Sequence, residues 1–185
     1  MLPETEQYPI QTLSSRTAFS CRWYQVRKDA VVFPDGKHGE YNVVDVIPCI
    51  FVVPVTPQGE IVLIHHYRHT LKQWVWEIPA GGIENTTPDA AVRTELREEI
   101  GGEASKIEYL GEFFPSNGFS NEVAHLYVAW DVALGEQKLE SAEAITVHPT
   151  SLDDALRMIR NNQLKDAPSA LAILLTESRI RARCL

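Results

Sequence analysis

The sequence predicts an α/β fold: a mixed β-sheet between layers of helices, an α/β/α sandwich, with a small antiparallel strand segment at its N-terminus. Three observations support this prediction. Short alternating apolar runs separated by turn sequences occupy the first part of the chain. One strongly marked helix follows near the middle, and two more helical segments lie toward the C-terminus. The 185 residues are enough for one full domain with a small appendage.

The part before the central helix predicts antiparallel strands joined by short turns. Residues 1 to about 16 are polar and predict a loosely tied arm. We expect strands in residues 17–33, 41–55, 61–65 and, after the helix, 107–114 and 125–132. Pro34-Asp35-Gly36 is a turn, because proline fixes its own φ and glycine accepts a positive φ. Trp74 and Trp76 share one face of a strand that ends at Ile78, and we expect both to pack under the following glycine passage.

The central helix is predicted to run from Pro88 to Ile100. Thr87 can cap its N-terminus, and Asp89 suits the positive end of the helix dipole. Gly101-Gly102 ends the helix, because glycine readily adopts the left-handed conformation with which helices terminate.

Two faces of this helix carry the chemistry and the packing. Val92, Leu96 and Ile100 form an apolar stripe, and Glu95, Glu98 and Glu99 form an acidic face beside it. Glu95 and Glu99 are like charges four residues apart, an arrangement that is destabilising by itself. A solvated surface face is one interpretation. Pro79-Ala80-Gly81-Gly82 favours another, because Mg²⁺ is typically held by one or two carboxylates together with substrate phosphates.

Two further helices are expected at the C-terminus, and we interpret both as structural. Ser151 begins a near capping box and a helix that continues through Ile159. Pro168-Ser169 begins the last helix. Its apolar residues should pack on the sheet: Leu171, Ile173, Leu174, Leu175 and Ile180.

Composition and charge exclude several classes of protein. A hydrophobic content of 44% and a charged content of 23% are typical of a soluble globular protein. The net charge of −8 opposes binding to nucleic-acid backbones and anionic membranes, so neither is expected as a partner. A small phosphate-rich molecule can still bind if cations offset the repulsion. The longest apolar run, residues 43–55, contains two prolines and an aspartate, so no membrane span is expected.

The cysteines and histidines favour neither a disulfide framework nor zinc. Cys21, Cys49 and Cys184 are widely spaced and form no CxxC pair, which favours reduced thiols. His65 and His66 are neighbours on a strand and so face opposite sides of it. The first residues show no basic start with an apolar signal core. We therefore expect a cytoplasmic enzyme.

The stretch from Trp76 to Gly102 resembles the Nudix box, G-x5-E-x7-R-E-U-x-E-E-x-G-U, in which U is aliphatic. Residues 95–101, ELREEIG, match its second half. Residues 77–82, EIPAGG, resemble the lead-in of the ADP-ribose pyrophosphatase branch of the Nudix hydrolases. The chain departs from the pattern at four places: Thr86 for the first Glu, Thr94 for the Arg, Ala80 for the first Gly with a loop one residue short, and Gly102 for the final aliphatic residue. The Arg and the first Glu pair in the family, so their joint loss strands no charge.

The resemblance implies a metal site and a general base. Glu95, Glu99 and the carbonyl of Ala80 would hold Mg²⁺ or Mn²⁺, and Glu98 would share a metal or orient it. Residues 139–147 resemble a D-E-x-I-E-V segment whose mobile loop supplies the catalytic base. Glu143 is the matching position, and Glu140 is the fallback. Two alternatives stay open: Glu98 or Glu99 is the base, or the two loop acids are only solvated.

The resemblance also implies a substrate site. Arg68 matches the Arg of a Q-Y-R signature that reaches the substrate phosphates, and guanidinium can bind phosphate with two parallel hydrogen bonds. Residues 115–122 resemble an S-P-G-F-S/T-D-E segment, with Asn at two positions where the pattern has Pro and Asp. There Glu122 would contact the ribose or a metal-bound water, beside Phe119 and Ser120. Trp23 would stack on a nucleobase. A surface arginine and an ordinary packed tryptophan are the alternatives.

The expected activity is metal-assisted attack of water on the pyrophosphate bond of a nucleoside diphosphate derivative. ADP-ribose is the leading substrate, which would give AMP and ribose 5-phosphate. The alternatives are another nucleotide sugar or a dinucleotide, or a catalytically impaired module that binds nucleotides for regulation. The resemblance further implies a homodimer, with an N-terminal strand arm (residues 1–45) for dimerisation and substrate binding and a Nudix domain (residues 46–185).

Overall fold

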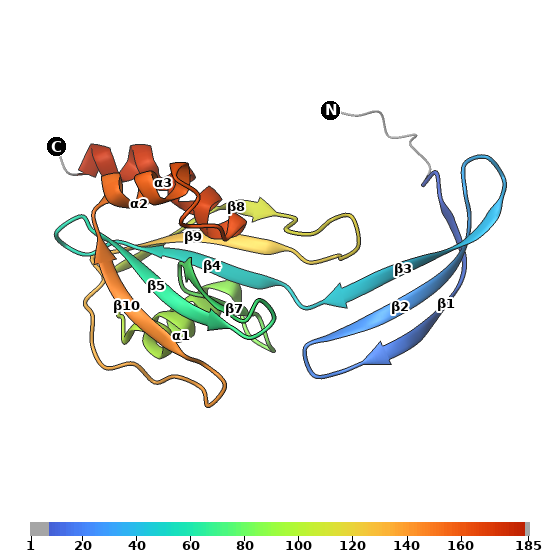
Figure 1. The fold of residues 1–185 in the computed structure, drawn as a ribbon, viewed down its shortest axis with the longest axis horizontal. Coiled ribbons are helices and arrows are strands. Elements are labelled where there is room, and N and C mark those ends of the chain that lie inside the picture. Colours follow the sequence, from blue (N-terminus) through green and yellow to red (C-terminus); the bar gives the residue numbers. More distant parts are fainter. Residues whose placement is uncertain (1–7, 184–185) are drawn as a thin grey trace. The chain divides into compact units, whose positions relative to one another are not determined.

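The computed structural model describes residues 8–183, which divide into two compact units (Figure 1). The first unit consists of the chain up to Ile47 together with Ser116–Glu122. The second unit consists of Pro48–Pro115 and the chain from Val123 onward. A short stretch from the second half of the sequence therefore belongs to the N-terminal unit.

The first unit is a three-stranded antiparallel sheet in the order β1-β2-β3. Its strands are β1 (Gln11–Ser20), β2 (Tyr24–Val32) and β3 (His38–Val46). Every residue of β1 is exposed, yet its backbone pairs with β2 along its length. The predicted loose arm is therefore wrong for residues 11–16, because ladder hydrogen bonds need no apolar side chains. Residues 1–7 of that arm lie outside the described chain.

The stretch Ser116–Glu122 is bonded to β3 through backbone and side chain. The Val44 N–H donates to the Phe119 carbonyl at 2.8 Å. The Asn121 side chain accepts from the Val46 N–H at 3.0 Å and donates to Asp45 at 2.9 Å. These bonds explain why this stretch belongs to the first unit.

The second unit contains a mixed sheet and an antiparallel sheet. Its elements are β4 (Cys49–Pro54), β5 (Ile61–Arg68), β6 (Gln73–Glu77), β7 (Ala80–Gly82), α1 (Pro88–Ile100), β8 (Lys106–Phe113), β9 (Ala124–Trp130), β10 (Ile145–Thr150), α2 (Leu152–Arg160) and α3 (Ala167–Arg183). One sheet has the order β7-β4-β9-β8, and the other has the order β10-β5-β6. Strands β4 and β9 are parallel and the remaining pairs are antiparallel, so the predicted mixed sheet is confirmed.

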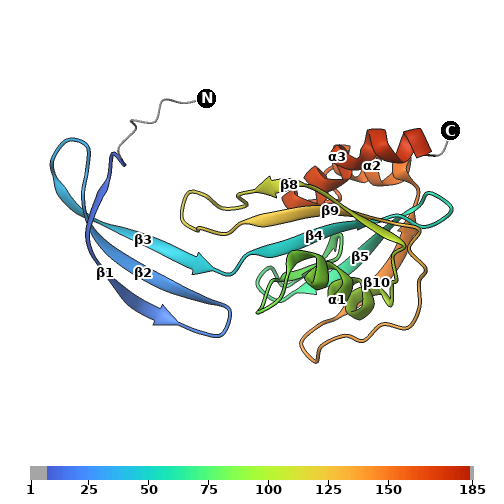
Figure 2. The ribbon, with the colours of Figure 1, turned by 180° about the vertical axis from the view of Figure 1, so that it is seen from behind.

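Helices cover the strands on two sides, with α2 and α3 on one side and α1 on the other (Figures 1 and 2). The alternation of side chains along each strand produces this layering. In β4, Val53 belongs to the core cluster beneath α2 and α3, whereas its neighbour Val52 belongs to the cluster beneath α1. Leu126 and Tyr127 of β9 divide in the same way. The predicted α/β/α sandwich is confirmed.

Helix α1 begins and ends where the sequence predicts. The Thr87 hydroxyl accepts from the Ala90 N–H at 3.3 Å, and Pro88 occupies the first turn. Gly101 has φ 61°, and the Gly102 N–H donates to the Leu96 carbonyl at 2.7 Å. The stripe Val92, Leu96 and Ile100 is fully buried. Among the helices of residues 8–183, none is long and apolar enough to cross a membrane.

Three expectations about packing and strand extent need correction. Leu174 and Leu175 are 47% and 40% exposed, because α3 turns Ala172, Ile173 and Thr176 inward instead. The strand expected over residues 41–55 breaks between β3 and β4, before Pro48, which has no N–H to donate. Trp74 is 46% exposed and does not pack under the glycine passage.

Ser169 ties the start of α3 to the strand end before the site. It is fully buried, and its hydroxyl accepts from the Ile78 N–H at 3.0 Å. Ser169→Ala should lower the free energy of unfolding by about 1–3 kcal/mol, because it strands a buried donor. Urea denaturation of this variant and of Ser178→Ala, an exposed serine on the same helix, measures the difference. Equal effects of the two changes would contradict the assignment.

Candidate active site

The glycine passage and the acidic face of α1 are in direct contact. The passage forms β7, which pairs with β4. A Cβ on Gly81 would overlap the Glu95 carboxylate, so a side chain at this position would displace that carboxylate. The Ala80 N–H donates to Glu99 Oε2 at 3.0 Å. Helix and passage therefore form one structure, with two carboxylates held against the backbone.

Burial makes these carboxylates hard to ionise. Glu99 is 1% exposed, and burial, followed by the charge of Glu95, holds its pKa well above the usual range. The hydrogen bond from Ala80 and the charge of Arg68 oppose this rise. Burial and then the charge of Glu98 raise the pKa of Glu95 to about 8. The acidic face is thus not a solvated surface, and a cation would lower the cost of charging it.

The donors fit a hard divalent cation. Carboxylate and backbone carbonyl oxygens are the ligands that Mg²⁺ and Mn²⁺ prefer. Within residues 8–183, no three His, Cys, Asp or Glu side chains converge as a ready-made metal cage. Mg²⁺ usually retains waters and is bound through one or two carboxylates plus substrate phosphates. Glu95 and Glu99 are two carboxylates that would fit this role, with Glu98 half-buried beside them.

The loop between β9 and β10 brings two more acids to this cluster. The Glu143 N–H donates to the Glu140 carbonyl at 3.0 Å, and the Glu140 N–H donates to the Glu143 carboxylate at 2.8 Å. The charges of both residues raise the pKa of Glu95, and Glu143 also raises that of Glu99. The two predicted loop acids therefore lie within electrostatic range of the helix acids.

Arg68 lies in the same unit and is held by an ion pair. Its Nε donates to Glu77 Oε1 at 2.9 Å, and its Nη2 donates to Oε2 at 2.5 Å. Glu77 is 4% exposed; burial raises its pKa, and the pairing with Arg68 opposes this rise. The charge of Arg68 lowers the pKa of Glu99, so the guanidinium belongs to the electrostatic environment of the acidic cluster.

Four predicted substrate residues lie in the first unit. Trp23 lies in the bend between β1 and β2, 51% exposed, with the Arg22 guanidinium 4.2 Å above its ring. Phe119 is 58% exposed. The Ser120 hydroxyl accepts from the Glu122 N–H at 3.0 Å. These residues share a unit with one another, while Arg68 and the acids belong to the second unit.

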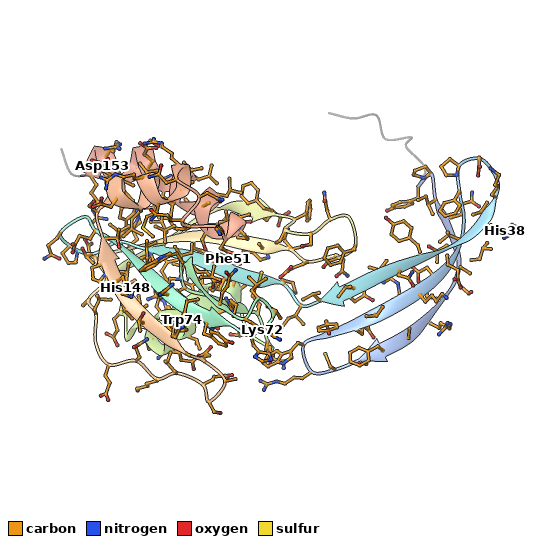
Figure 3. The ribbon with its side chains drawn as sticks, in the orientation of Figure 1. His38, Phe51, Lys72, Trp74, His148 and Asp153 are labelled. Carbon is orange, nitrogen blue, oxygen red and sulfur yellow. The ribbon has the colours of Figure 1, made fainter. Side chains whose placement is uncertain are left out.

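Trp74 and Trp76 belong to a group of rings on the β10-β5-β6 sheet rather than to the glycine passage. The ring of His65 stacks on Trp76 with centroids 4.3 Å apart and lies 5.3 Å from Trp74. His148 of β10 meets Trp76 edge-on at 4.8 Å, and Figure 3 labels both Trp74 and His148. These histidines therefore pack with aromatic rings.

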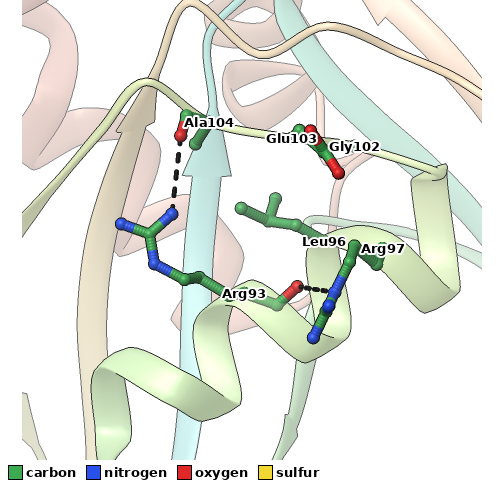
Figure 4. Close-up of a pocket in the computed structure, with 6 residues that line it drawn as sticks. All are labelled: Arg93, Leu96, Arg97, Gly102, Glu103 and Ala104. Atoms are coloured by element: carbon green, nitrogen blue, oxygen red, sulfur yellow. Dashed lines mark hydrogen bonds between the residues drawn. The ribbon is translucent and has the colours of Figure 1, made fainter.

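A pocket of about 260 Å³ lies against α1, and Glu95, Glu98 and Glu99 are not among its lining residues (Figure 4). It is lined by Arg93, Leu96, Arg97, Gly102, Glu103 and Ala104. Arg93 Nη1 donates to the Ala104 carbonyl at 3.5 Å, and Arg97 Nε donates to the Arg93 carbonyl at 3.2 Å. Arg93 and Arg97 thus lie on a different side of α1 from Glu95, Glu98 and Glu99.

Two residues near the site were not predicted from the sequence. Glu77 was recognised only as part of a motif, because its pairing with Arg68 depends on how β5 and β6 align. Gln137 donates to the Glu99 carbonyl at 2.5 Å across 38 residues of sequence. No local pattern around Gln137 indicates this contact.

The comparisons with known proteins agree with this geometry. The Nudix domain model matches residues 47–171, and the model described as a nucleoside diphosphate sugar hydrolase N-terminal domain matches residues 10–44. The chain is 30% identical over 166 residues to the ADP-ribose pyrophosphatase of Bacillus subtilis, covering 88% of this chain and 90% of that protein. It is 31% identical, with the same coverage, to the methanol dehydrogenase activator of Bacillus methanolicus.

A solved structure matches over nearly the whole chain. It is described as the crystal structure of an ADP compounds hydrolase, with a TM-score of 0.82 at 18% identity, covering 95% of this chain and 96% of that one. At this identity the likeness concerns the fold alone.

A mixed sheet between helices, with carboxylates of one helix against a glycine passage, is the arrangement that the Nudix resemblance predicts. The chain belongs to the Nudix family, and within it to the branch of the ADP-ribose pyrophosphatases. It is a pyrophosphohydrolase that acts on nucleoside diphosphate derivatives. Nudix hydrolases generally use divalent metal ions.

The raised pKa of Glu95 predicts a pH-dependent stability of the metal-free protein. The folded state holds the proton up to about pH 8, whereas the unfolded chain releases it near 4.5. Stability should therefore fall as pH rises between these values, and Glu99 should act in the same direction. Glu95→Gln should reduce this fall, while Glu112→Gln, an exposed control, should not. Melting temperatures in a chelator test this, and identical pH curves for Glu95→Gln and the unmodified protein would contradict it.

Proposed function

We propose that the protein hydrolyses ADP-ribose to AMP and ribose 5-phosphate with Mg²⁺ or Mn²⁺. One observation carries the proposal: the half-buried Glu95 and the buried Glu99 lie against the backbone of the glycine passage, where a cation would offset the cost of ionising them. Two relatives named ADP-ribose pyrophosphatase support the substrate, at 30% and 27% identity.

The metal would be held by Glu95, Glu99 and the Ala80 carbonyl, with Glu98 sharing or orienting it. When bound, it would polarise the phosphoryl oxygens, neutralise the leaving group and lower the pKa of the attacking water. Gly81 keeps the passage close enough for the Glu95 carboxylate to reach it. The Ala80 N–H fixes one oxygen of Glu99, which leaves the other oxygen for the cation.

Glu143 would accept the proton of the attacking water. The charge of Glu143 raises the pKa of both Glu95 and Glu99, whereas the charge of Glu140 raises the pKa of Glu95. This difference favours Glu143 over Glu140 as the base. Glu140 remains the fallback, and Glu98 remains the alternative on the helix.

Arg68 would bind the substrate phosphates. The pair with Glu77 uses its Nε and Nη2, and a guanidinium has five N–H donors in a planar fork. Glu77 thereby fixes the plane of the fork. In the first unit, Glu122, Phe119 and Ser120 would contact the ribose, and Trp23 would stack on the base.

A different nucleotide sugar is the second candidate substrate. It is favoured by the match of residues 10–44 to a nucleoside diphosphate sugar hydrolase N-terminal domain. A dinucleotide, or nucleotide binding for regulation without turnover, completes the alternatives; one relative is named an activator of methanol dehydrogenase.

We further propose that the protein is a homodimer located in the cytoplasm. We do not expect it to bind nucleic acid. Residues 1–45 would form the dimerisation and substrate segment, and residues 46–185 the Nudix domain. The exposed apolar residues Leu13, Phe19 and Tyr41 on the first sheet support a protein partner for it. The net charge of −8 opposes nucleic acid.

The substrate proposal is tested with a panel of ADP-ribose, nucleotide sugars and dinucleotides at a fixed Mg²⁺ concentration. We expect ADP-ribose to give the highest kcat/KM, with AMP and ribose 5-phosphate as products. Glu99→Gln should lower kcat/KM by at least about 100-fold, because it removes a ligand of the cation that neutralises the leaving group. If no member of the panel is hydrolysed, the regulatory nucleotide-binding role becomes the remaining explanation. If a nucleotide sugar gives a higher kcat/KM than ADP-ribose, that sugar replaces ADP-ribose as the proposed substrate.

The identity of the base is tested by Glu143→Gln and Glu140→Gln. Removal of a general base costs about 10²–10⁴-fold in rate, so Glu143→Gln should lower kcat by that factor and leave the Mg²⁺ dependence unchanged. Glu140→Gln, the matched change three residues earlier, should have a much smaller effect. A kcat of Glu143→Gln within twofold of that of the unmodified enzyme would assign the base to the helix.

A further inference from the structure

The loop between β9 and β10 is packed tightly against the end of α1 before it reaches its acids. A Cβ on Gly101 would overlap the backbone of Gly135, and a Cβ on Gly135 would lie 3.0 Å from the Gly101 carbonyl oxygen. A side chain at position 101 would displace the Gly135 backbone, and a side chain at position 135 would crowd the Gly101 carbonyl oxygen. The loop therefore starts from a fixed point at the helix C-terminus.

The next residues of the loop bond to the last turn of α1. The Gln137 side-chain amide donates to the Glu99 carbonyl at 2.5 Å, and the Lys138 N–H donates to the Glu98 carbonyl at 2.8 Å. The last carbonyls of a helix have no intrahelical partner. Gly101 and Gly102 serve the Leu96 carbonyl, so the loop completes the capping of this helix end.

The acidic turn that follows is held at both of its ends. Leu139 packs against the core beneath α1, and the Ala144 carbonyl accepts from the Tyr67 N–H at 3.0 Å. Between these anchors lie Glu140 to Glu143, closed by the two hydrogen bonds already described. The position of the turn is thus set by contacts on its flanks.

We infer that Gln137 is a positioning residue: by donating to the main-chain carbonyl of Glu99, it holds the turn that carries Glu140 and Glu143 beside the carboxylates of α1. The inference rests on the proposed function for its catalytic consequence. The same peptide segment of α1 carries the Glu99 side chain toward the glycine passage and offers its carbonyl to Gln137. Gln137 is thereby one of the flanking contacts that place Glu143 relative to the Glu99 carboxylate.

The contribution of Gln137 is separable from that of its neighbours. The Lys138 bond uses the backbone and survives any side-chain change, and Leu139 acts by packing alone. Gln137→Met keeps the length and most of the volume of the side chain but removes the donor. It leaves the Glu99 carbonyl without this partner and loosens one flank of the turn.

The test compares Gln137→Met with Gln163→Met, the same change at an exposed glutamine between α2 and α3. Amide hydrogen exchange is measured without substrate or metal, so it does not depend on the proposed activity. Exchange in residues 140–144 should become about five- to tenfold faster in Gln137→Met, the size expected for one hydrogen bond. Gln163→Met should match the unmodified protein.

Kinetics then show whether the held turn matters for the reaction. In Gln137→Met, kcat should fall about five- to tenfold with KM changed by less than about twofold, because a group acting only in the transition state is displaced. A second variant, Gly135→Ala, should change kcat in the same direction, since its Cβ would lie 3.0 Å from the Gly101 oxygen and push the loop away.

Two outcomes overturn the inference. Unchanged exchange in residues 140–144 of Gln137→Met shows that the side chain does not hold the turn. Faster exchange with an unchanged kcat shows that the held turn has no catalytic consequence. If the unmodified protein turns over no diphosphate at all, the proposed function fails, while the exchange result still decides whether Gln137 fixes the turn.

Discussion

The contact between the glycine passage and the carboxylates of α1 is the constraint on which the rest of the structure depends. Glycine at position 81 leaves room for the Glu95 carboxylate beside the passage, and Glu99 is almost fully buried. Burying ionisable carboxylates side by side opposes folding unless they hold protons or a cation. The apolar stripe of α1 and the pairing of β7 with β4 supply the packing that keeps the carboxylates in place. The surrounding layers thus hold a group that would otherwise move toward water.

Local signals were enough to predict α1, but not its environment. Thr87, Pro88 and Gly101 act within a few residues of sequence, so the helix boundaries follow from the chain alone. The failures concern packing between distant elements. Leu174 and Leu175 are as apolar as Ile173, yet the rotation of α3 on the sheet decides which of them is buried. The burial of Glu99 has the same origin.

The site could be predicted in part for the same reason. Glu95, Glu98 and Glu99 stand on one helix, so their spacing alone places them together. The proximity of Glu143 depends on a loop that returns over the helix end, and only the family pattern predicted it. The Arg68–Glu77 pair depends on strand alignment, and the Gln137–Glu99 bond depends on the packing of a loop. Neither leaves a periodic signal in the sequence.

Thr86 and Thr94, which replace the pair that braces the loop in the family, are compatible with an ordered site because this loop is held in other ways. The Ile83 N–H donates to the Pro48 carbonyl at 2.8 Å, and its side chain packs on the core beneath α1. Asn85 has φ 51°, a left-handed conformation that asparagine tolerates, and one such residue lets a shorter loop turn into the helix cap. Backbone bonds and packing are insensitive to salt, unlike an exposed ion pair. A loop anchored by them needs no Arg or Glu at these two positions, and the carboxylates of α1 contact the glycine passage without that brace.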